Sequence, residues 1–186
     1  MKNFKVIKKF IREDICRQMS KQMFDAEQRG YNLNQNDVQC QKSSSFYGLF
    51  NDIQALCQKK LEIEIGEELL PTYNYCRIYK KGETLEKHVD RESCEISITV
   101  TLDYPQSPWS FWAKDNDSDI EMLLLKGDAC LYKGCEVPHW RNELTHQTWQ
   151  TQAFFHYVLK NGPNTAHAYD TIVNGKNICH TPQTNI

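Results

Sequence analysis

The sequence predicts a mainly β protein, a jelly roll or antiparallel sandwich with supporting α-helices at its N-terminal end. Two observations predict this fold class. In the first 70 residues apolar side chains recur every three or four positions, which is typical of amphipathic helices. From Tyr73 onward they recur every second position, in eight short segments separated by turn residues. Eight short alternating strands are typical of a jelly roll, which buries one face of each strand.

The N-terminal part predicts a short strand followed by two helices. The first helix is predicted over 12–27, where apolar residues share one face. Residues 31–43 are rich in Asn and Gln and show no period, so we expect a loop there. A second helix is predicted over 45–60, with Ser44 or Ser45 as its N-cap.

The β region and the tail complete one predicted domain over 1–186. The eight candidate strands span residues 73–80, 86–91, 95–103, 109–113, 121–125, 127–133, 137–141 and 148–158. We expect supporting helices in 1–70, a barrel core in 71–160 and a C-terminal tail in 161–186, which carries turn residues and is predicted to run over the surface.

The composition argues against some classes of function. The chain has 22 Lys and Arg residues against 24 Asp and Glu, for a formal net charge of −2. A nonspecific nucleic-acid binder is usually strongly basic, so the charge argues against nucleic acid as a partner. The sequence has neither an apolar run of the length that spans a membrane nor a signal-peptide pattern, so we expect a cytoplasmic protein without membrane association. The eight cysteines form no CxxC pair, and we expect reduced thiols.

The segment 86–91, EKHVDR, carries the most informative chemical signal. Residues two apart on a strand point to the same face, so His88 and Asp90 present an imidazole and a carboxylate to one point. His139 is the best candidate for a third ligand, because the predicted strand 127–133 opens at a Gly-Asp turn and leads the chain to Val137, Pro138 and His139. Two histidines and one carboxylate on one face leave three positions of an octahedral iron open, as in non-haem Fe(II) oxygenases.

The order of these motifs resembles that of the Fe(II)/2-oxoglutarate-dependent dioxygenases, close to their small prolyl-hydroxylase-like branch. Tyr79 precedes His88 by nine residues, and a long β region and the segment GDACLY lead to His139, 49 residues after Asp90. The resemblance covers residues 70–160 and implies a double-stranded β-helix of the cupin type. It implies Fe(II), 2-oxoglutarate and O₂ as cofactor and cosubstrates, with His88, Asp90 and His139 as the catalytic metal ligands. The implied reaction hydroxylates a substrate C–H bond while 2-oxoglutarate is decarboxylated to succinate and CO₂.

The sequence departs from the family where the far carboxylate of 2-oxoglutarate binds. In the family a basic residue on the last barrel strand pairs with this carboxylate, but residues 146–151, HQTWQT, contain neither Lys nor Arg. A buried dicarboxylate needs a counter-charge. Arg141 is the first candidate, because it lies on the same strand face as His139 and its planar fork suits bidentate carboxylate binding. Arg77 is the second candidate.

Other polar side chains are predicted to line the same pocket. Tyr79 matches a family tyrosine that helps to hold the cosubstrate. Thr101, together with Thr99, lies on a strand expected to line the pocket, and Gln152 on the last strand is a further candidate. Candidates to orient the two metal-binding histidines by hydrogen bonds are Arg91, Glu95 and Asp128.

The substrate is less defined than the metal site. The resemblance favours a peptidyl side chain or a small amino-acid-like molecule. The absent basic residue leaves open a cupin-type metal enzyme that does not use 2-oxoglutarate, and a noncatalytic jelly-roll binding module is the other alternative. The sequence does not indicate an oligomeric state.

Two further features are predicted to lie outside the site. Residues 115–119, DNDSD, resemble the start of a calcium loop, but Ile120 and Lys126 replace the Gly and Glu that such a loop needs. We therefore expect a solvated hairpin tip. Strand alternation points Trp140 to the side opposite His139, so it is expected to pack away from the metal.

Overall fold

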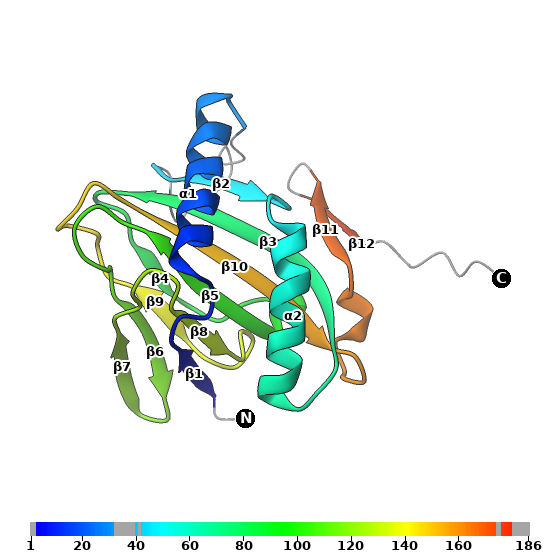
Figure 1. The fold of residues 1–186 in the computed structure, drawn as a ribbon. Helices are drawn as coiled ribbons and strands as arrows, with labels where there is room; N and C mark the ends of the chain where they lie inside the picture. The colour runs from blue at the N-terminus through cyan, green and yellow to red at the C-terminus, as the bar shows by residue number, and fades with distance from the viewer. Residues whose placement is uncertain (1–2, 32–39, 41, 174–175, 180–186) are drawn as a thin grey trace.

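Two antiparallel sheets pack against each other in the computed structural model, and two helices cover the outer face of the larger one (Figure 1). The structure describes residues 3–31, 40, 42–173 and 176–179. The larger sheet has the strand order β1-β8-β5-β10-β3-β2, and the smaller has the order β4-β9-β6-β7. This mainly β architecture confirms the predicted jelly-roll class. Within the described residues, none of the helices has the length and apolar character needed to cross a membrane.

The first three strands belong to the larger sheet, and from β3 onward the chain crosses repeatedly between the two sheets. The strands of the larger sheet are β1 Phe4–Ile7, β2 Ser44–Tyr47, β3 Leu69–Lys80, β5 Ile96–Asp103, β8 Ala129–Tyr132 and β10 Trp149–Leu159. The strands of the smaller sheet are β4 Leu85–His88, β6 Phe111–Asp115, β7 Ser118–Met122 and β9 His139–Arg141. The remaining elements are α1 Glu13–Gln28, α2 Asn51–Ile65, the 3₁₀ turns Glu92–Cys94 and Thr165–His167, and the hairpin β11 Asp170–Val173 with β12 Lys176–Cys179.

The main hydrophobic core lies between the helices and the larger sheet. The helices contribute a stripe of apolar residues at helical spacing, namely Cys16, Met19, Met23, Cys57 and Leu61. This stripe packs on alternate residues of the central strands, among them Ile98, Val100 and Phe155. A second cluster fills part of the space between the two sheets and includes Phe111 of β6, Met122 of β7 and Tyr132 of β8. The site described below lies in this inner space.

The predictions for the helices are confirmed in part. The helix predicted over 12–27 is α1, and all eight predicted strands are present with shifted ends. The second helix begins later than predicted, because Ser44–Tyr47 form β2 and pair with β3 instead of starting the helix. A turn with Gly48 at a φ of 69° then separates β2 from the helix, so the predicted Ser44 or Ser45 cap is wrong. Most of the predicted loop, residues 32–39 and 41, lies outside the described residues.

The described part of the tail is more ordered than its turn-rich sequence suggests. The backbone N–H of Tyr169 donates a hydrogen bond to the Pro71 carbonyl oxygen at 2.7 Å, and β11 packs beside β3. Asp170 is buried and forms an ion pair with Arg91 at 2.8 Å. The tail is thereby attached to the segment that follows β4. Residues 174–175 and 180–186 lie outside the described residues.

Candidate metal centre

The structure brings His88, Asp90 and His139 to one point between the sheets. β4 and β9 are paired neighbours, with His88 and His139 opposite each other. The Asp90 Oδ1 atom lies 3.5 Å from His88 Nε2 and 3.6 Å from His139 Nε2. One ligand atom from each residue lies within 4.8 Å of the others, a spacing at which three side chains can hold one metal ion. The three predicted residues therefore form a candidate metal centre.

Backbone carbonyls fix the orientation of both histidines. His88 Nδ1 lies 2.7 Å from the Glu86 carbonyl oxygen, and His139 Nδ1 lies 2.9 Å from the Val137 carbonyl oxygen. A carbonyl oxygen only accepts, so each Nδ1–H donates and each Nε2 keeps its lone pair for a metal. The side chains predicted for this role bind elsewhere, and that prediction is wrong. Their observed partners are Asp170 for Arg91, the Leu159 N–H for Glu95, and Lys8, the Lys9 N–H and the Leu125 N–H for Asp128.

The pKa shifts of His139 and Asp90 suit a divalent cation, while the shift of His88 means that a metal has to displace a proton there. Burial lowers the pKa of His139 and outweighs the attraction of Asp90. Burial also opposes the charge on His88, but the hydrogen bonds of His88 with Asp90 and the Glu86 carbonyl outweigh it and raise the pKa of His88. For Asp90 burial acts to raise the pKa, while the neighbouring histidines outweigh it and lower the pKa of this carboxyl. A carboxylate and neutral imidazoles are the forms that bind a metal.

A cavity of about 180 Å³ opens beside this centre. One wall carries the three candidate ligands, and the other walls are mostly aromatic. The lining residues besides the triad are Tyr47, Tyr73, Tyr75, Arg77, Tyr79, Leu85, Tyr132, Phe154 and His156. The ring centroids of Tyr47 and Tyr75 lie 4.7 Å apart, and those of Tyr73 and His156 lie 4.6 Å apart. The cavity thus combines a metal-binding end with flat aromatic walls that also carry polar groups.

Arg141 is a buried cation that lacks an anionic partner. It lies two residues after His139 on β9 and is 1% exposed. Its Nη1 donates to the Trp109 carbonyl oxygen at 2.6 Å, while Nε and Nη2 are buried without a hydrogen-bond partner. Its guanidinium carbon lies 5.0 Å from the Trp109 ring centroid and 5.3 Å from that of Phe111. Burial lowers the pKa of Arg141 to about 10, so the side chain stays charged at neutral pH.

The structural comparisons give the same fold. A Pseudomonas putida prolyl-4-hydroxylase shares 14% identity with a TM-score of 0.65, over 84% of this chain and 94% of that one. A Trichoplax adhaerens prolyl hydroxylase, solved with a hypoxia inducible factor peptide fragment, has a TM-score of 0.70 at 11% identity, over 86% and 85%. HygX from Streptomyces hygroscopicus, solved with nickel and 2-oxoglutarate, has a TM-score of 0.59 at 14% identity, over 86% and 84%. No protein-family model and no curated protein sequence matches.

The chain has the fold of the Fe(II)/2-oxoglutarate-dependent oxygenases. In this oxygenase fold the last barrel strand is β10, and none of its residues is Lys or Arg. Two of its inward-facing side chains, Gln150 and Gln152, are amides, and Phe154 and His156 follow them on the same face. The Gln152 Nε2 donates to the Thr99 hydroxyl at 2.8 Å, and the Thr101 hydroxyl donates to the Gln152 Oε1 at 3.3 Å. Thr101 thus lies inside the barrel as expected, with its hydroxyl proton directed at Gln152.

The other two predicted cosubstrate residues line the cavity. Arg77 is 6% exposed, and its Nε donates to the Tyr75 hydroxyl at 2.8 Å. Tyr79 is 1% exposed, and its ring meets the Trp109 ring edge-on at a centroid distance of 5.0 Å. Because Arg141 packs on the same Trp109 ring, Tyr79 and Arg141 lie at one end of the inner space. Burial raises the pKa of Tyr79, so its hydroxyl keeps its proton at neutral pH.

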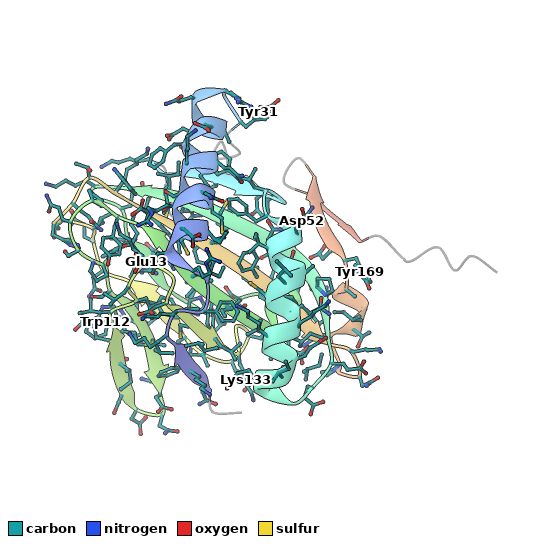
Figure 2. All side chains as sticks on the ribbon, in the orientation of Figure 1. Glu13, Tyr31, Asp52, Trp112, Lys133 and Tyr169 are labelled. Carbon is teal, nitrogen blue, oxygen red and sulfur yellow. The ribbon has the colours of Figure 1, made fainter. Side chains whose placement is uncertain are left out.

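The features predicted to lie outside the site do so. Trp140 stacks on Trp112 with a centroid distance of 6.0 Å, on the face of the smaller sheet opposite His139. Figure 2 shows Trp112 at the outer side of this sheet. The tip of the hairpin between β6 and β7 carries Asn116 at a φ of 52°, and the flanking residues are paired up to Asp115 and Ser118.

Two residues that sequence reasoning missed contact the centre. Ser97 Oγ lies 3.3 Å from Asp90 Oδ2 and 2.8 Å from His156 Nδ1. Burial lowers the pKa of His156 to about 4, so its imidazole is neutral at neutral pH. The sequence does contain a signal for Ser97, because it lies two residues before Thr99 on a strand and therefore shares the face that is predicted to line the pocket.

Proposed function

We propose that this protein is an Fe(II)- and 2-oxoglutarate-dependent dioxygenase that hydroxylates a C–H bond of a peptidyl or small amino-acid-like substrate. His88, Asp90 and His139 would hold the metal. Arg141 would bind the far carboxylate of 2-oxoglutarate, with Tyr79 beside it and Arg77 as a secondary contact, while Thr101 would line the pocket with its hydroxyl bonded to Gln152. Bound iron, 2-oxoglutarate and O₂ would supply the oxidising chemistry, with decarboxylation of 2-oxoglutarate to succinate.

The unpaired Arg141 guanidinium is the observation that carries this proposal. A buried charge without a partner destabilises a protein, so such a group indicates a ligand of opposite charge. It lies two residues from His139, on the face of β9 that also carries a candidate metal ligand. A metal centre and a separate cation in one barrel suit a ligand with a chelating end and a far carboxylate. This is the chemistry of 2-oxoglutarate.

The chain's own residues would bind and orient the metal and the cosubstrate, and they would exclude water. The carbonyls of Glu86 and Val137 hold the histidine Nε2 atoms toward the metal position. The aromatic walls keep water from the remaining coordination positions. The similar structures include a prolyl hydroxylase with a peptide fragment and HygX with hygromycin B bound, so they fit a peptidyl substrate and a small molecule alike. A reducing, cytoplasmic location is part of the proposal, and the unbridged thiols of the cysteines at positions 16, 57, 76, 94, 130 and 135 support it.

The test separates metal binding, cosubstrate binding and turnover. Purified protein is titrated with Mn(II), then with 2-oxoglutarate in the presence of Mn(II), and succinate release is measured with Fe(II) and O₂. His139→Ala should lose Mn(II) binding, while Arg141→Met should retain Mn(II) and lose about 100-fold in 2-oxoglutarate affinity. Matched controls are His167→Ala, an exposed histidine paired with Glu92, and Arg12→Met, an exposed arginine paired with Asp14. Both controls should behave as wild type.

The two alternatives give different outcomes in the same assay. Wild-type protein that binds no divalent metal would be a noncatalytic jelly-roll module. Protein that binds Mn(II) but neither binds nor decarboxylates 2-oxoglutarate would be a cupin-type metal enzyme of another class, for which the absence of a basic residue on β10 is the argument. Either result overturns the proposal.

A further inference from the structure

Asp90 differs from the two histidines in how it is held. Its Oδ1 faces both histidine Nε2 atoms, while its Oδ2 is directed at Ser97 Oγ. Ser97 lies on β5 and is fully buried, and its Oγ is also 2.8 Å from His156 Nδ1 on β10. The two oxygens of one carboxylate therefore have separate environments, one toward the histidines and one toward the larger sheet.

The direction of the hydrogen bonds follows from the groups present. The Ser97 hydroxyl has a single proton, and two oxygens accept it, Asp90 Oδ2 at 3.3 Å and the Cys94 carbonyl at 3.1 Å. Neither oxygen can donate to Ser97. With the hydroxyl proton directed at one of these oxygens, the tautomer that satisfies the remaining 2.8 Å contact is the one in which His156 Nδ1–H donates to the Ser97 Oγ. A neutral imidazole in this state has no proton on Nε2.

The space around these groups leaves Asp90 little freedom. Gly134 lies so close that a Cβ there would be 2.6 Å from Asp90 Oδ2 and 2.7 Å from Ser97 Oγ. The Asp90 N–H also donates to the Gly134 carbonyl at 2.8 Å. His156 is 5% exposed and its ring packs on Tyr73, so it is held on its other side as well. The carboxylate is thus enclosed on its Oδ2 side by three separate segments of the chain.

We propose that Ser97 and His156 are positioning residues that occupy Asp90 Oδ2 and so present Oδ1 alone to the metal. This inference rests on the proposed function, because it takes Asp90 as a metal ligand. The chain of hydrogen bonds runs from His156 through Ser97 to Asp90. It also leaves His156 Nε2 as a hydrogen-bond acceptor in a residue that lines the cavity, where a substrate N–H or O–H can meet it.

Cobalt binding tests the role of Ser97. Removing a hydrogen bond to a ligating side chain typically costs 10–100-fold in metal affinity, and we expect a loss of about that size for Co(II) in Ser97→Ala. The visible absorption of the bound Co(II) should change too, because Asp90 then becomes free to bind through both oxygens. Thr72→Val is the matched control: its buried hydroxyl donates to the Ser93 carbonyl at 2.7 Å but does not touch Asp90. It should keep the affinity and spectrum of wild type.

The His156 variants test the direction of the chain. His156→Phe should weaken Co(II) binding, and His156→Asn, which offers an amide N–H near the position of Nδ1, should restore most of the affinity. Adding His156→Phe to Ser97→Ala should cause little further loss, because the two residues act in series. In Zn(II)-loaded protein, ¹⁵N NMR should show the His156 proton on Nδ1.

The outcomes distinguish this inference from the proposed function. Wild-type protein that binds no Co(II) overturns the assignment of the metal centre itself. If wild-type protein binds Co(II) and Ser97→Ala binds it with the same affinity and spectrum, only the positioning role is overturned. A proton on His156 Nε2 with Nδ1 unprotonated contradicts the chain of hydrogen bonds. Thermal unfolding of each metal-free variant confirms that the measured protein is folded.

Discussion

The two faces of the larger sheet are equally buried and chemically opposite. On β5 and β10 the face toward the helices carries apolar side chains, among them Ile98, Val100, Ala153 and Phe155. The face toward the smaller sheet carries polar side chains of the same burial, namely Ser97, Thr99, Thr101, Gln150, Gln152 and His156. The helix face gains stability from apolar contact, whereas the inner face costs stability unless its polar groups find partners. Burial alone therefore does not distinguish the face that forms the hydrophobic core from the face that lines the candidate site.

The two faces of the larger sheet differ in their hydrogen bonding. The amides of the inner face bond to one another, with Gln150 Nε2 donating to Gln152 Oε1 at 3.2 Å and Gln152 donating to Thr99. Arg141 interrupts this pattern, because two of its nitrogens lack a partner. Unsatisfied buried polar groups in native proteins are rare, so each calls for an explanation. The other side-chain atoms of this kind among the described residues belong to Arg91, Ser93 and Asp170. The inner face is complete except where a ligand is expected.

The largest expected effect is a loss of stability from the helix face. Phe155 is fully buried in the main core, and Phe155→Ala should lower the free energy of unfolding by about 3–5 kcal/mol, because it removes apolar contact and leaves a cavity. Urea denaturation measures this change. Ile63→Ala at an 86% exposed position is the control and should shift stability by no more than about 0.5 kcal/mol. If Phe155→Ala weakened Mn(II) binding by the folded protein, the two faces would not be independent.

The second effect is an expected gain in the free energy of unfolding, at a residue of the inner face. Arg141→Met removes a buried charge that lacks an anionic partner, and apolar replacements of buried charges are often stabilising by 1–4 kcal/mol. The variant also loses the hydrogen bond to the Trp109 carbonyl, so we expect a net gain of about 1 kcal/mol in the ligand-free protein. Added 2-oxoglutarate with Mn(II) should raise the unfolding temperature of wild type but not of the variant. A ligand-free variant less stable than wild type would show that Arg141 is a structural residue.

The sequence predicts the strands well because their signal is local. Alternation in 95–103 and 148–158 predicts β5 and β10, and the shared face of His88 and Asp90 follows from strand geometry. The same alternation misleads about environment, because an apolar–polar pattern usually means one solvated face. Here the smaller sheet covers the polar face. The sequence predicts the start of a helix where β2 lies, because a four-residue edge strand is defined by its partner β3 rather than by its own residues.

The parts of the site that could not be predicted depend on contacts between distant residues. Every residue has a carbonyl, so nothing in the sequence marks those of Glu86 and Val137 as the groups that orient the histidines. The contact between Ser97 and His156 joins positions 59 residues apart, on two strands whose pairing sets it. Arg141 was a candidate from strand phase alone, but its lack of an anionic partner is a property of the folded chain.

The smallest expected effect concerns a part of the inner face where the polar groups are hydrogen-bonded to one another. The Thr101 hydroxyl donates its proton to Gln152 Oε1, which also accepts a hydrogen bond from Gln150. Thr101→Val keeps the shape of the side chain and leaves that oxygen with a partner, so the free energy of unfolding should fall by about 1 kcal/mol or less. Since the hydroxyl proton is engaged within the protein, 2-oxoglutarate affinity in the presence of Mn(II) should stay close to that of wild type. A clear loss of affinity without a loss of stability would instead mean that Thr101 turns its hydroxyl to the cosubstrate. The polar inner face would then rearrange on binding, in contrast to the fixed packing of the helix face.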